Sequence, residues 1–335
     1  MRSFLACILL IPTLHAEPRK LIFDTDMGND VDDVQALALI HALQSRGVVE
    51  LLAVTTSKDH PLSAPFASAI NTFYGRPNIP VGAVRGGATP DEGKYLGLAS
   101  RKDGAGEPVF PNNTTPPDAV ALLRQTLAAQ PDGSVHIAQV GFSTNLARLL
   151  ESGADASSTL TGIDLVRRKV RQLVVMAGAF DSSGKFKDHL EFNVVKDIRS
   201  AKTLAGNWPG PIVWSGFEIG MGMRFPSASV REDYRTPTRH IVRDAYVAYC
   251  GEHGENPTWD LTCPLYIAFP DRGYFGLSGP GKVEISDEGK TTFTAAPNGP
   301  HRYLTHSPLQ AARTLEAFVQ LCATPPAAGE RDHLK

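Results

Sequence analysis

The sequence predicts a single α/β domain built on a mostly parallel, doubly wound sheet. The chain has 335 residues, enough for one large domain with its own core. Apolar runs typical of strands alternate with segments of helical periodicity through most of the length. One run, Gln172 to Met176, is almost wholly apolar, as expected for a parallel strand covered on both faces. No Pro- or Ser-rich linker and no internal repeat divides the sequence.

The elements follow from these two periodicities. Short runs rich in β-branched and other apolar residues predict strands at 20–23, 49–55, 79–84, 135–140, 172–176 and 211–214, and a late hairpin at 283–285 and 291–293. Apolar residues at helical spacing predict helices at 34–43, 64–73, 119–129, 145–150, 197–204, 239–250, 261–268 and 308–321. The stretch 86–117, rich in Gly, Pro, Asn and Thr, predicts a long surface loop.

The first sixteen residues have the features of a secretory signal. Arg2 supplies a positive charge, Phe4 to Ile11 is an apolar run too short to cross a bilayer, and Ala16 is a small residue suited to cleavage. A buried N-terminal strand is the alternative. We expect a signal peptide at 1–16, a catalytic domain at 17–335, and a secreted or periplasmic protein with no membrane association after cleavage.

Charge and cysteine content argue against two other classes. The chain has 33 Lys and Arg against 35 Asp and Glu, a net charge of −2, so it lacks the basic excess of a nucleic-acid-binding protein. The four cysteines are sparse and form no CxxC pair, which is not the pattern of a disulfide framework. We expect no nucleic-acid partner.

An acidic loop follows the first predicted strand. It places five carboxylates within ten residues, at Asp24, Asp26, Asp30, Asp32 and Asp33. In doubly wound folds, ligands bind beyond the carboxyl ends of the strands. Carboxylates packed this closely repel one another unless they share a cation, and a hard divalent ion such as calcium or magnesium prefers oxygen ligands. A solvated acidic helix cap is the alternative.

Two known acidic loops do not fit this stretch. Counted from Asp24, an EF-hand would need Gly at the sixth position and Glu at the twelfth, where this chain has Asn29 and Gln35. Phosphatases of the haloacid dehalogenase type have Thr or Val where Gly28 stands. A glycine at this position instead allows a sharp backbone turn beneath an ion.

Three further blocks follow the acidic loop. They read Val140-Gly141-Phe142-Ser143-Thr144-Asn145-Leu146-Ala147, then Met176-Ala177-Gly178-Ala179 with Glu191-Phe192-Asn193, and finally Thr258-Trp259-Asp260. Together with the loop, which has the form DTDxGxDxDD, they resemble the motifs of the inosine-uridine-type nucleoside hydrolase family in the family's own order. The resemblance covers most of residues 19–320. It implies calcium-dependent hydrolysis of the N-glycosidic bond of ribonucleosides to free base and ribose.

The resemblance implies a metal-binding role for residues from three of these blocks. The side chains of Asp26, Asp33 and Asp260 and the backbone carbonyl of Val140 would hold a calcium ion. Asp26 would also accept the proton of the attacking water, which makes it the implied catalytic base. Asp24 would support the loop beneath the ion. A metal that lowers the pKa of water beside a carboxylate is sound chemistry for hydrolysis.

The resemblance also implies contacts with the sugar. Asp32 would engage the ribose hydroxyls together with the ion, and Glu191 and Asn193 would hydrogen-bond the ribose. Their spacing predicts that both lie on one face of a strand-like segment, with Phe192 on the other. A surface strand with outward polar residues is the alternative. Carboxylates beside the ring would stabilise the oxocarbenium character of the transition state.

The sequence departs from the family at the leaving-group side. Many members carry a His just before the last acidic ligand, where it protonates the leaving base, but this chain has Trp259. An indole can stack on a base, and the purine-preferring branch has Trp at this place, so the resemblance implies a purine preference. A core aromatic is the alternative. His240 and His253 are candidates for the missing acid.

Two segments that contact the sugar in the family also differ. Asp59, within Ser57 to His60, stands in place of a Gly-Asn pair and could substitute for the Asn, and residues 181–187 lack a second Asn. A related hydrolase acting on another ribosyl compound therefore stays open, as does a non-catalytic, calcium-stabilised sugar-binding protein. The resemblance further implies a small-molecule nucleoside substrate and a homodimer or homotetramer.

Overall fold

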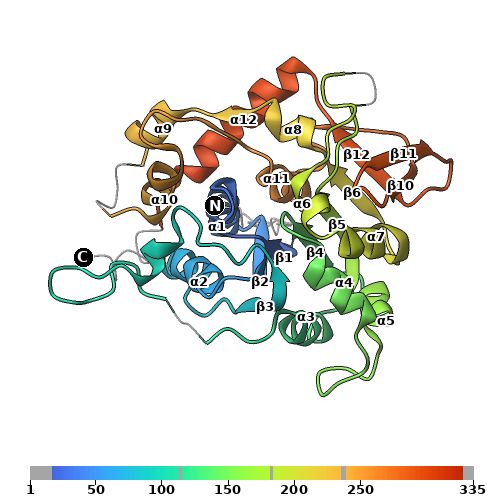
Figure 1. The fold of residues 1–335 in the computed structure, drawn as a ribbon, viewed down its shortest axis with the longest axis horizontal. Coiled ribbons are helices and arrows are strands. Elements are labelled where there is room, and N and C mark those ends of the chain that lie inside the picture. Colours follow the sequence, from blue (N-terminus) through green and yellow to red (C-terminus); the bar gives the residue numbers. More distant parts are fainter. Residues whose placement is uncertain (1–16, 113–114, 182–183, 235–238, 327–335) are drawn as a thin grey trace, which may run out of the picture.

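Ten strands form one central sheet in the computed structural model, with helices on both faces (Figure 1). The structure describes residues 17–112, 115–181, 184–234 and 239–326. The predicted signal peptide, 1–16, lies outside these residues. Within them, no helix combines the length and apolar character needed to cross a membrane. The predicted mostly parallel, doubly wound α/β fold is confirmed.

The parallel part of the sheet has the order β12-β6-β5-β4-β1-β2-β3. Its strands are β1 (Arg19–Thr25), β2 (Val49–Lys58), β3 (Val81–Ala88), β4 (Val135–Gln139), β5 (Val170–Met176), β6 (Ile212–Ser215) and β12 (His301–Thr305). The antiparallel strands β9 (Gly276–Leu277), β10 (Gly281–Ile285) and β11 (Thr291–Ala295) extend it beyond β12. The chain winds outward from β1 to β3, then returns to β4 and winds the other way, so β1 and β4 flank the switch point.

Two sets of helices cover the two faces (Figure 1). One face carries α1 (Asp32–Ser45), α2 (Ser63–Phe73), α10 (Ile241–Cys250), α11 (Thr262–Ala268) and α12 (Pro308–Cys322). The other carries α3 (Ala119–Ala128), α4 (Thr144–Glu151), α5 (Gly162–Lys169) and α7 (Ile198–Asn207). Shorter elements lie over the carboxyl ends of the strands or at the edges: η1 (Leu96–Ser100), α6 (Phe192–Lys196), α8 (Phe217–Met221), α9 (Ser227–Glu232), β7 (Arg224–Phe225) and β8 (Asn256–Pro257).

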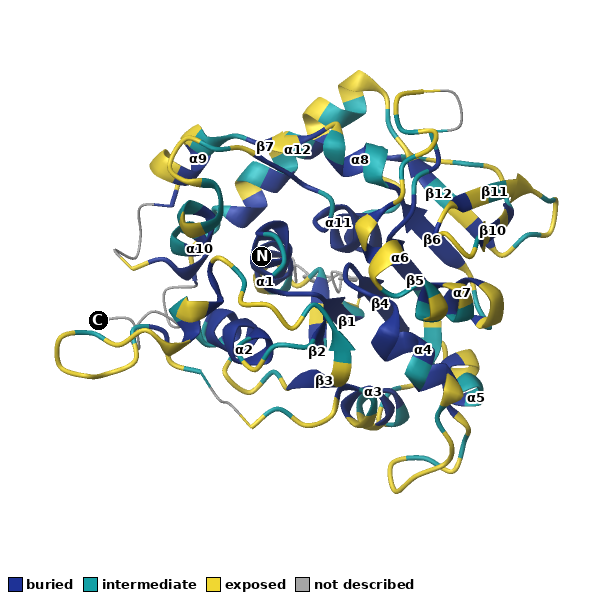
Figure 2. Ribbon diagram, in the orientation of Figure 1, coloured by how far each residue is buried: buried dark blue, intermediate teal, exposed yellow. Residues whose placement is uncertain are grey.

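A hydrophobic core lies on each face of the sheet, and the central strands contribute side chains to both, because successive side chains point to opposite faces. In β1, Leu21 and Phe23 join the core under α1, whereas Ile22 joins the core under α3 and α4. β5 alternates in the same way, with Val174 in the first core and Val175 in the second. Figure 2 shows these strands as buried. Burial on both faces explains why the strands read as continuous apolar runs.

Several local expectations differ from the structure. The strand-like conformation predicted for 191–193 is wrong, because Glu191 is the N-cap of α6 and its carboxylate accepts the backbone N–H groups of Asn193 and Val194. The predicted loop 86–117 contains the short helix η1 and a buried Tyr95. Strand β12 was not expected, since its sequence His301–Thr305 is largely polar and forms a strand through pairing with β6, β9 and β10.

Candidate active site

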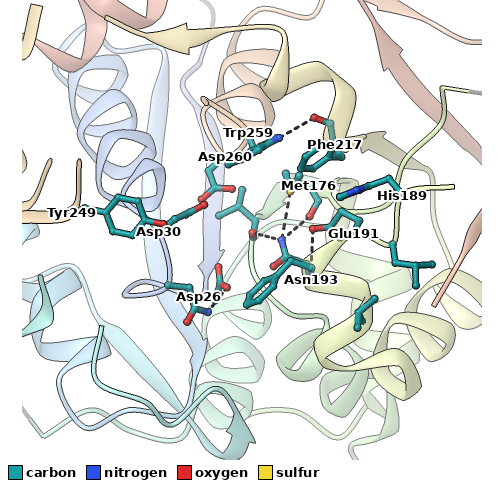
Figure 3. A pocket seen from close by; sticks show the side chains of 15 residues that line it. Asp26, Asp30, Met176, His189, Glu191, Asn193, Phe217, Tyr249, Trp259 and Asp260 are labelled. Atoms are coloured by element: carbon teal, nitrogen blue, oxygen red, sulfur yellow. Dashed lines mark hydrogen bonds between the residues drawn. The ribbon is translucent and has the colours of Figure 1, made fainter. Parts of the chain in front are cut away.

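A cavity of about 460 Å³ lies at the switch point, beyond the carboxyl ends of β1 and β4 (Figure 3). Its polar lining consists of Asp26, Asn29, Asp30, Glu191, Asn193 and Asp260. Its aromatic and apolar lining consists of Val140, Met176, His189, Leu190, Phe192, Val195, Phe217, Tyr249 and Trp259. The sequence segments that lie far apart along the chain thus meet in one place, as the fold class predicts.

The acidic loop turns sharply at Gly28. This residue has φ of +120°, and a Cβ there would lie 2.6 Å from a methyl carbon of Leu96, so only glycine fits. Tyr95 holds both sides of the turn: its hydroxyl accepts the Gly28 N–H at 2.7 Å and donates to the Asp30 carbonyl at 2.6 Å. Tyr95, which stands just before the short helix η1, therefore fixes the shape of the loop.

Asp24 is buried beneath the loop. Its Oδ1 accepts hydrogen bonds from the Thr55 hydroxyl at 2.5 Å and the Asn145 amide at 2.8 Å, which come from β2 and α4. Burial nevertheless raises the pKa of Asp24 to about 7. The backbone also joins the strands here, because the Val140 N–H donates to the Asp24 carbonyl at 2.7 Å. A Cβ at Gly141 would collide with the backbone nitrogen of Asp26.

The late acidic residue joins the acidic loop. Asp30, Asp33 and Asp260 each offer a carboxylate oxygen, and these oxygens lie within 4.8 Å of one another. The N–H of Asp260 donates to Asp32 Oδ2 at 3.0 Å. Asp33 also accepts a short hydrogen bond from the Thr25 hydroxyl. This is a set of hard oxygen donors of the kind that holds a divalent cation.

The electrostatics of the cluster fit a bound cation. Burial is the main cause that raises the pKa of Asp26 to about 7, and the nearby Asp30 carboxylate adds to it. The pKa values of Asp33 and Asp260 are raised well above their usual range by burial and by the other carboxylates. The buried oxygens Asp32 Oδ1 and Asp33 Oδ2 have no hydrogen-bond partner among the described residues. A shared cation would satisfy these oxygens and relieve the repulsion.

The sugar side of the cavity is formed by the start of α6. The Glu191 carboxylate accepts the Gly178 N–H at 3.1 Å in addition to its two capping bonds, and burial raises its pKa to about 7. The Asn193 amide nitrogen donates to the carbonyls of Val140 at 2.8 Å and Met176 at 3.2 Å. The Asn193 side chain is thereby held with its carbonyl oxygen free of other described partners.

Three rings form an aromatic wall of the cavity: His189, Phe217 and Trp259 (Figure 3). The His189 and Phe217 ring centroids are 3.7 Å apart with an interplanar angle of 27°, and those of Phe217 and Trp259 are 5.3 Å apart at 29°. The Trp259 indole N–H donates to the Phe217 carbonyl at 2.8 Å. Trp259 is therefore a fixed part of the cavity wall and is not enclosed in the core.

Other residues singled out from the sequence lie elsewhere. Asp59 does not line the cavity; its carboxylate accepts the Gly87 N–H at 3.1 Å. His240 is fully buried against Phe73 and Tyr234, so the proposal that it supplies an acid to this site is wrong. His253 lies outside the cavity, beside Arg231.

The structure adds cavity residues to which the sequence gave no individual role: Asn29, Asp30, His189, Leu190, Val195, Phe217 and Tyr249. Asn29 and Asp30 belong to the acidic loop, so their position in it was a usable signal. His189 stands two residues before Glu191, directly beside the family motif that contains Glu191 and Asn193, so its position was also a usable signal. Phe217 and Tyr249 lie outside all four blocks, and no local pattern marks them.

Comparison with known proteins agrees with this fold and site. The sequence model of the family described as inosine-uridine preferring nucleoside hydrolase matches residues 21–307. This chain belongs to that family. The predicted resemblance to this family is confirmed. The protein is therefore a hydrolase of the nucleoside hydrolase class.

Individual relatives are more distant. An uncharacterized protein of Schizosaccharomyces pombe is 30% identical over 217 residues, which cover 60% of this chain and 61% of that protein. A probable uridine nucleosidase 2 of Oryza sativa subsp. japonica is 27% identical over 189 residues, covering 54% and 52%. The chain thus matches about half to three-fifths of the length of these curated relatives.

Solved structures extend the likeness over nearly the whole chain. A plant nucleoside hydrolase, PpNRh1, superimposes with a TM-score of 0.70 at 20% identity and covers 92% of this chain and 100% of its own. A purine-preferring ribonucleoside hydrolase from Gardnerella vaginalis gives a TM-score of 0.70 at 15% identity, covering 91% and 98%. At this identity the comparison shows a shared fold.

Proposed function

We propose that this protein hydrolyses the N-glycosidic bond of ribonucleosides to free base and ribose, depends on calcium, and prefers purines. One observation carries the proposal: the acidic loop, Asp260 and the start of α6 converge on one cavity at the switch point. Family membership supports hydrolysis of nucleosides. The finer claims rest on the chemistry of the lining residues.

The metal would be held by oxygen donors of this cluster. Asp33 and Asp260 would bind it together with Asp26 and the Val140 carbonyl, and Asp30 adds a further carboxylate oxygen within reach. Calcium accepts six to eight oxygens in flexible geometry, which suits a set of carboxylates and a backbone carbonyl. When bound, the ion would orient the sugar diol and lower the pKa of water.

The remaining steps belong to protein side chains. Asp26 accepts the proton of the water that attacks C1′, because its carboxylate lines the cavity beside the cluster that would hold the ion. The carbonyl oxygen of Asn193 accepts a hydrogen bond from a ribose hydroxyl, since its amide nitrogen is already engaged. Glu191 places negative charge beside the ring, where oxocarbenium character develops.

The aromatic wall supports a purine preference. A base that stacks on the Trp259 indole gains about 1–3 kcal/mol, and a two-ring purine covers more of the indole than a pyrimidine does. Phe217 and His189 lie on the side of the cavity away from Asp26 and Asp30, so sugar and base would bind at opposite ends of the cavity (Figure 3).

A mutational test addresses the proposal directly. Asp26→Asn keeps the shape of the side chain but cannot accept the proton, so we expect release of reducing sugar from inosine to fall by about 100-fold or more. The matched control is Asp59→Asn, which changes a carboxylate outside the cavity. Unchanged turnover in Asp26→Asn would reject the proposal. The calcium requirement is tested by measuring turnover of inosine with calcium added and with a chelator added. We expect activity only with calcium.

A related substrate is the second candidate. Among the described residues of the two segments that differ from the family pattern, neither Asp59 nor residues 184–187 line the cavity. That leaves room for another ribosyl compound. A panel of inosine, adenosine, guanosine, uridine and ribosyl conjugates decides between the two, because efficient turnover of the standard nucleosides argues against this candidate. Binding of ribose without turnover of any glycoside would instead support a sugar-binding protein.

We also propose export and self-association. The charged start, short apolar run and small residue at 16 support cleavage of a signal peptide and a secreted or periplasmic protein. N-terminal sequencing of the mature protein and cell fractionation test this. A homodimer or homotetramer is tested by light scattering of the purified protein.

A further inference from the structure

His189 lines the cavity but has no role in the steps above. It lies between β5 and α6, two residues before Glu191, and its ring is partly buried. Figure 3 shows the imidazole directed into the cavity beside Phe217. Its face is fixed by the stack on Phe217, and neither ring nitrogen has a hydrogen-bond partner among the described residues. The edge of the ring is therefore free to meet a ligand.

The proposed reaction needs a proton donor on the side of the base. When the C1′–N bond breaks, the bonding electrons stay on the base, which is a poor leaving group as an anion. The other titratable groups of the cavity are badly suited to this. Asp26, Asp30 and Asp260 gather at the metal end, and Glu191 is engaged by three backbone N–H groups.

Tyr249 is the remaining titratable group of the cavity, and it lies beside Asp30 at the metal end (Figure 3). Burial and the carboxylates of the acidic loop raise the pKa of its phenol, so it holds its proton tightly. Desolvation lowers the pKa of His189 below 6.5, which makes its protonated form a stronger acid. Imidazole is also the side chain that exchanges protons most readily near neutral pH.

We propose that His189 is the catalytic acid that protonates the leaving base, in the position opposite the acidic cluster. The proposal rests on the proposed function. The rings of His189, Phe217 and Trp259 follow one another in a single stack, and all three line the cavity, so a base bound against this wall meets the imidazole edge. The wall thus offers the Trp259 indole for stacking and the His189 imidazole for proton donation, and Trp259 need not supply a proton.

In this step the C1′–N bond breaks and its electron pair passes to the base. At the same time an imidazolium N–H of His189 gives its proton to a ring nitrogen of that base. Water forms the new bond to C1′ and loses its proton to Asp26. The base leaves neutral, and His189 regains a proton from solvent, to which its partly exposed ring has access.

The test compares two leaving groups in two variants. His189→Phe keeps a flat ring for the stack but has no proton to give, and His189→Gln keeps polarity without an acid. Inosine needs protonation of its base, whereas p-nitrophenolate leaves p-nitrophenyl β-D-ribofuranoside without it. We expect kcat on inosine to fall by about 100-fold or more in both variants, with kcat on the nitrophenyl riboside little changed. The matched control is His253→Gln, outside the cavity.

Each outcome has a defined meaning. Full activity of His189→Phe on inosine would overturn the proposal and leave only a stacking role. An equal loss on both substrates would also overturn it, because a positioning role affects both leaving groups. If the wild-type protein hydrolyses neither substrate, the proposed function itself fails, and this inference fails with it.

Discussion

The backbone N–H of Asp260 donates to Asp32 Oδ2 at 3.0 Å, across 228 positions of the sequence. Both residues are buried. Asp32 begins α1 at the end of the acidic loop, and Asp260 lies just before α11, so this bond joins the first and last parts of the cavity. The acceptor oxygen on Asp32 therefore helps to position the Asp260 carboxylate in the cluster.

The bond predicts a difference between two substitutions at Asp32. Asp32→Ala leaves the Asp260 N–H buried without a partner, which costs about 1–3 kcal/mol in free energy of unfolding. Asp32→Asn keeps an acceptor oxygen and loses only charge, so it should be the more stable of the two. Urea unfolding in a chelator measures both. Equal stabilities would show that the hydrogen bond does not matter.

Calcium is expected to stabilise the folded protein. At 100 times its Kd, a ligand of the native state adds about 2.7 kcal/mol. The raised pKa values of Asp26, Asp33 and Asp260 set the pH dependence: on acidification these carboxylates bind protons, which compete with the ion. The gain in Tm should be large at pH 7.5 and small at pH 5. It should vanish in Asp33→Asn but persist in Asp59→Asn.

Lys58 is expected to position the catalytic base through Asn29. Its buried ammonium donates to Asn29 Oδ1 at 2.9 Å and to the Thr89 carbonyl at 2.8 Å, and the Asn29 amide donates to Asp26 Oδ2 at 2.6 Å. Lys58→Met removes the hydrogen bond to Asn29 Oδ1, so the Asn29 side chain is held less firmly against Asp26. We expect kcat to fall by about 10- to 100-fold, because small errors in the orientation of a catalytic group are costly.

The matched control for this variant is Lys20→Met, which removes a partly exposed lysine paired with Glu50. Circular dichroism and Tm confirm that both variants fold. A Lys58→Met enzyme with normal kcat would contradict a positioning role.

Trp259 is expected to influence the choice of base. Trp259→Leu removes the stacking surface and the hydrogen bond to the Phe217 carbonyl, while keeping an apolar side chain. The ratio of kcat/KM for inosine to that for uridine should fall by about 10-fold, in line with the loss of 1–3 kcal/mol of stacking. Parallel losses on both nucleosides would show that the indole has no part in specificity.

His240 is expected to make the fold sensitive to acid. Burial lowers its pKa from 6.5 to about 3, so the folded protein keeps it neutral while the unfolded chain binds a proton below about pH 6.5. Its stabilising contribution is present above pH 6.5 and is lost as the pH falls toward 3.

His240→Phe removes this dependence and fills the space between Phe73 and Tyr234. Between pH 7.5 and 5, the wild-type protein should lose about 2 kcal/mol more unfolding free energy than this variant. Denaturant unfolding at the two pH values measures the difference, and identical losses would show that His240 is protonated in the fold.

The sequence alone was sufficient for the framework of the fold and for part of the cavity lining. The apolar runs of β1 and β5 follow from burial on both faces, a property that local sequence records directly. The acidic loop predicted a cation site, because closely packed carboxylates repel one another unless a cation lies between them. Four blocks in order then pointed to Asp260, although it stands far from the loop.

Local pattern failed where a long-range contact decides the outcome. Glu191 and Asn193 have the spacing of a strand, but the capping bonds of Glu191 start a helix. Strand β12 forms through long-range pairing with β6, β9 and β10. Among the histidines, His240 is enclosed in the core and His189 faces the cavity, a difference that the packing of the whole fold decides.

The sequence by itself determined the fold class, the acidic loop and the family motifs, since periodicity and side-chain chemistry are local properties. Only the tertiary structure decided which groups share the cavity: the carboxylates that lie within 4.8 Å, the bond from Asp260 to Asp32, and the stack of His189, Phe217 and Trp259. The reason is physical. Strand pairing and crossover connections set distances between segments more than two hundred residues apart, and no local pattern contains those distances.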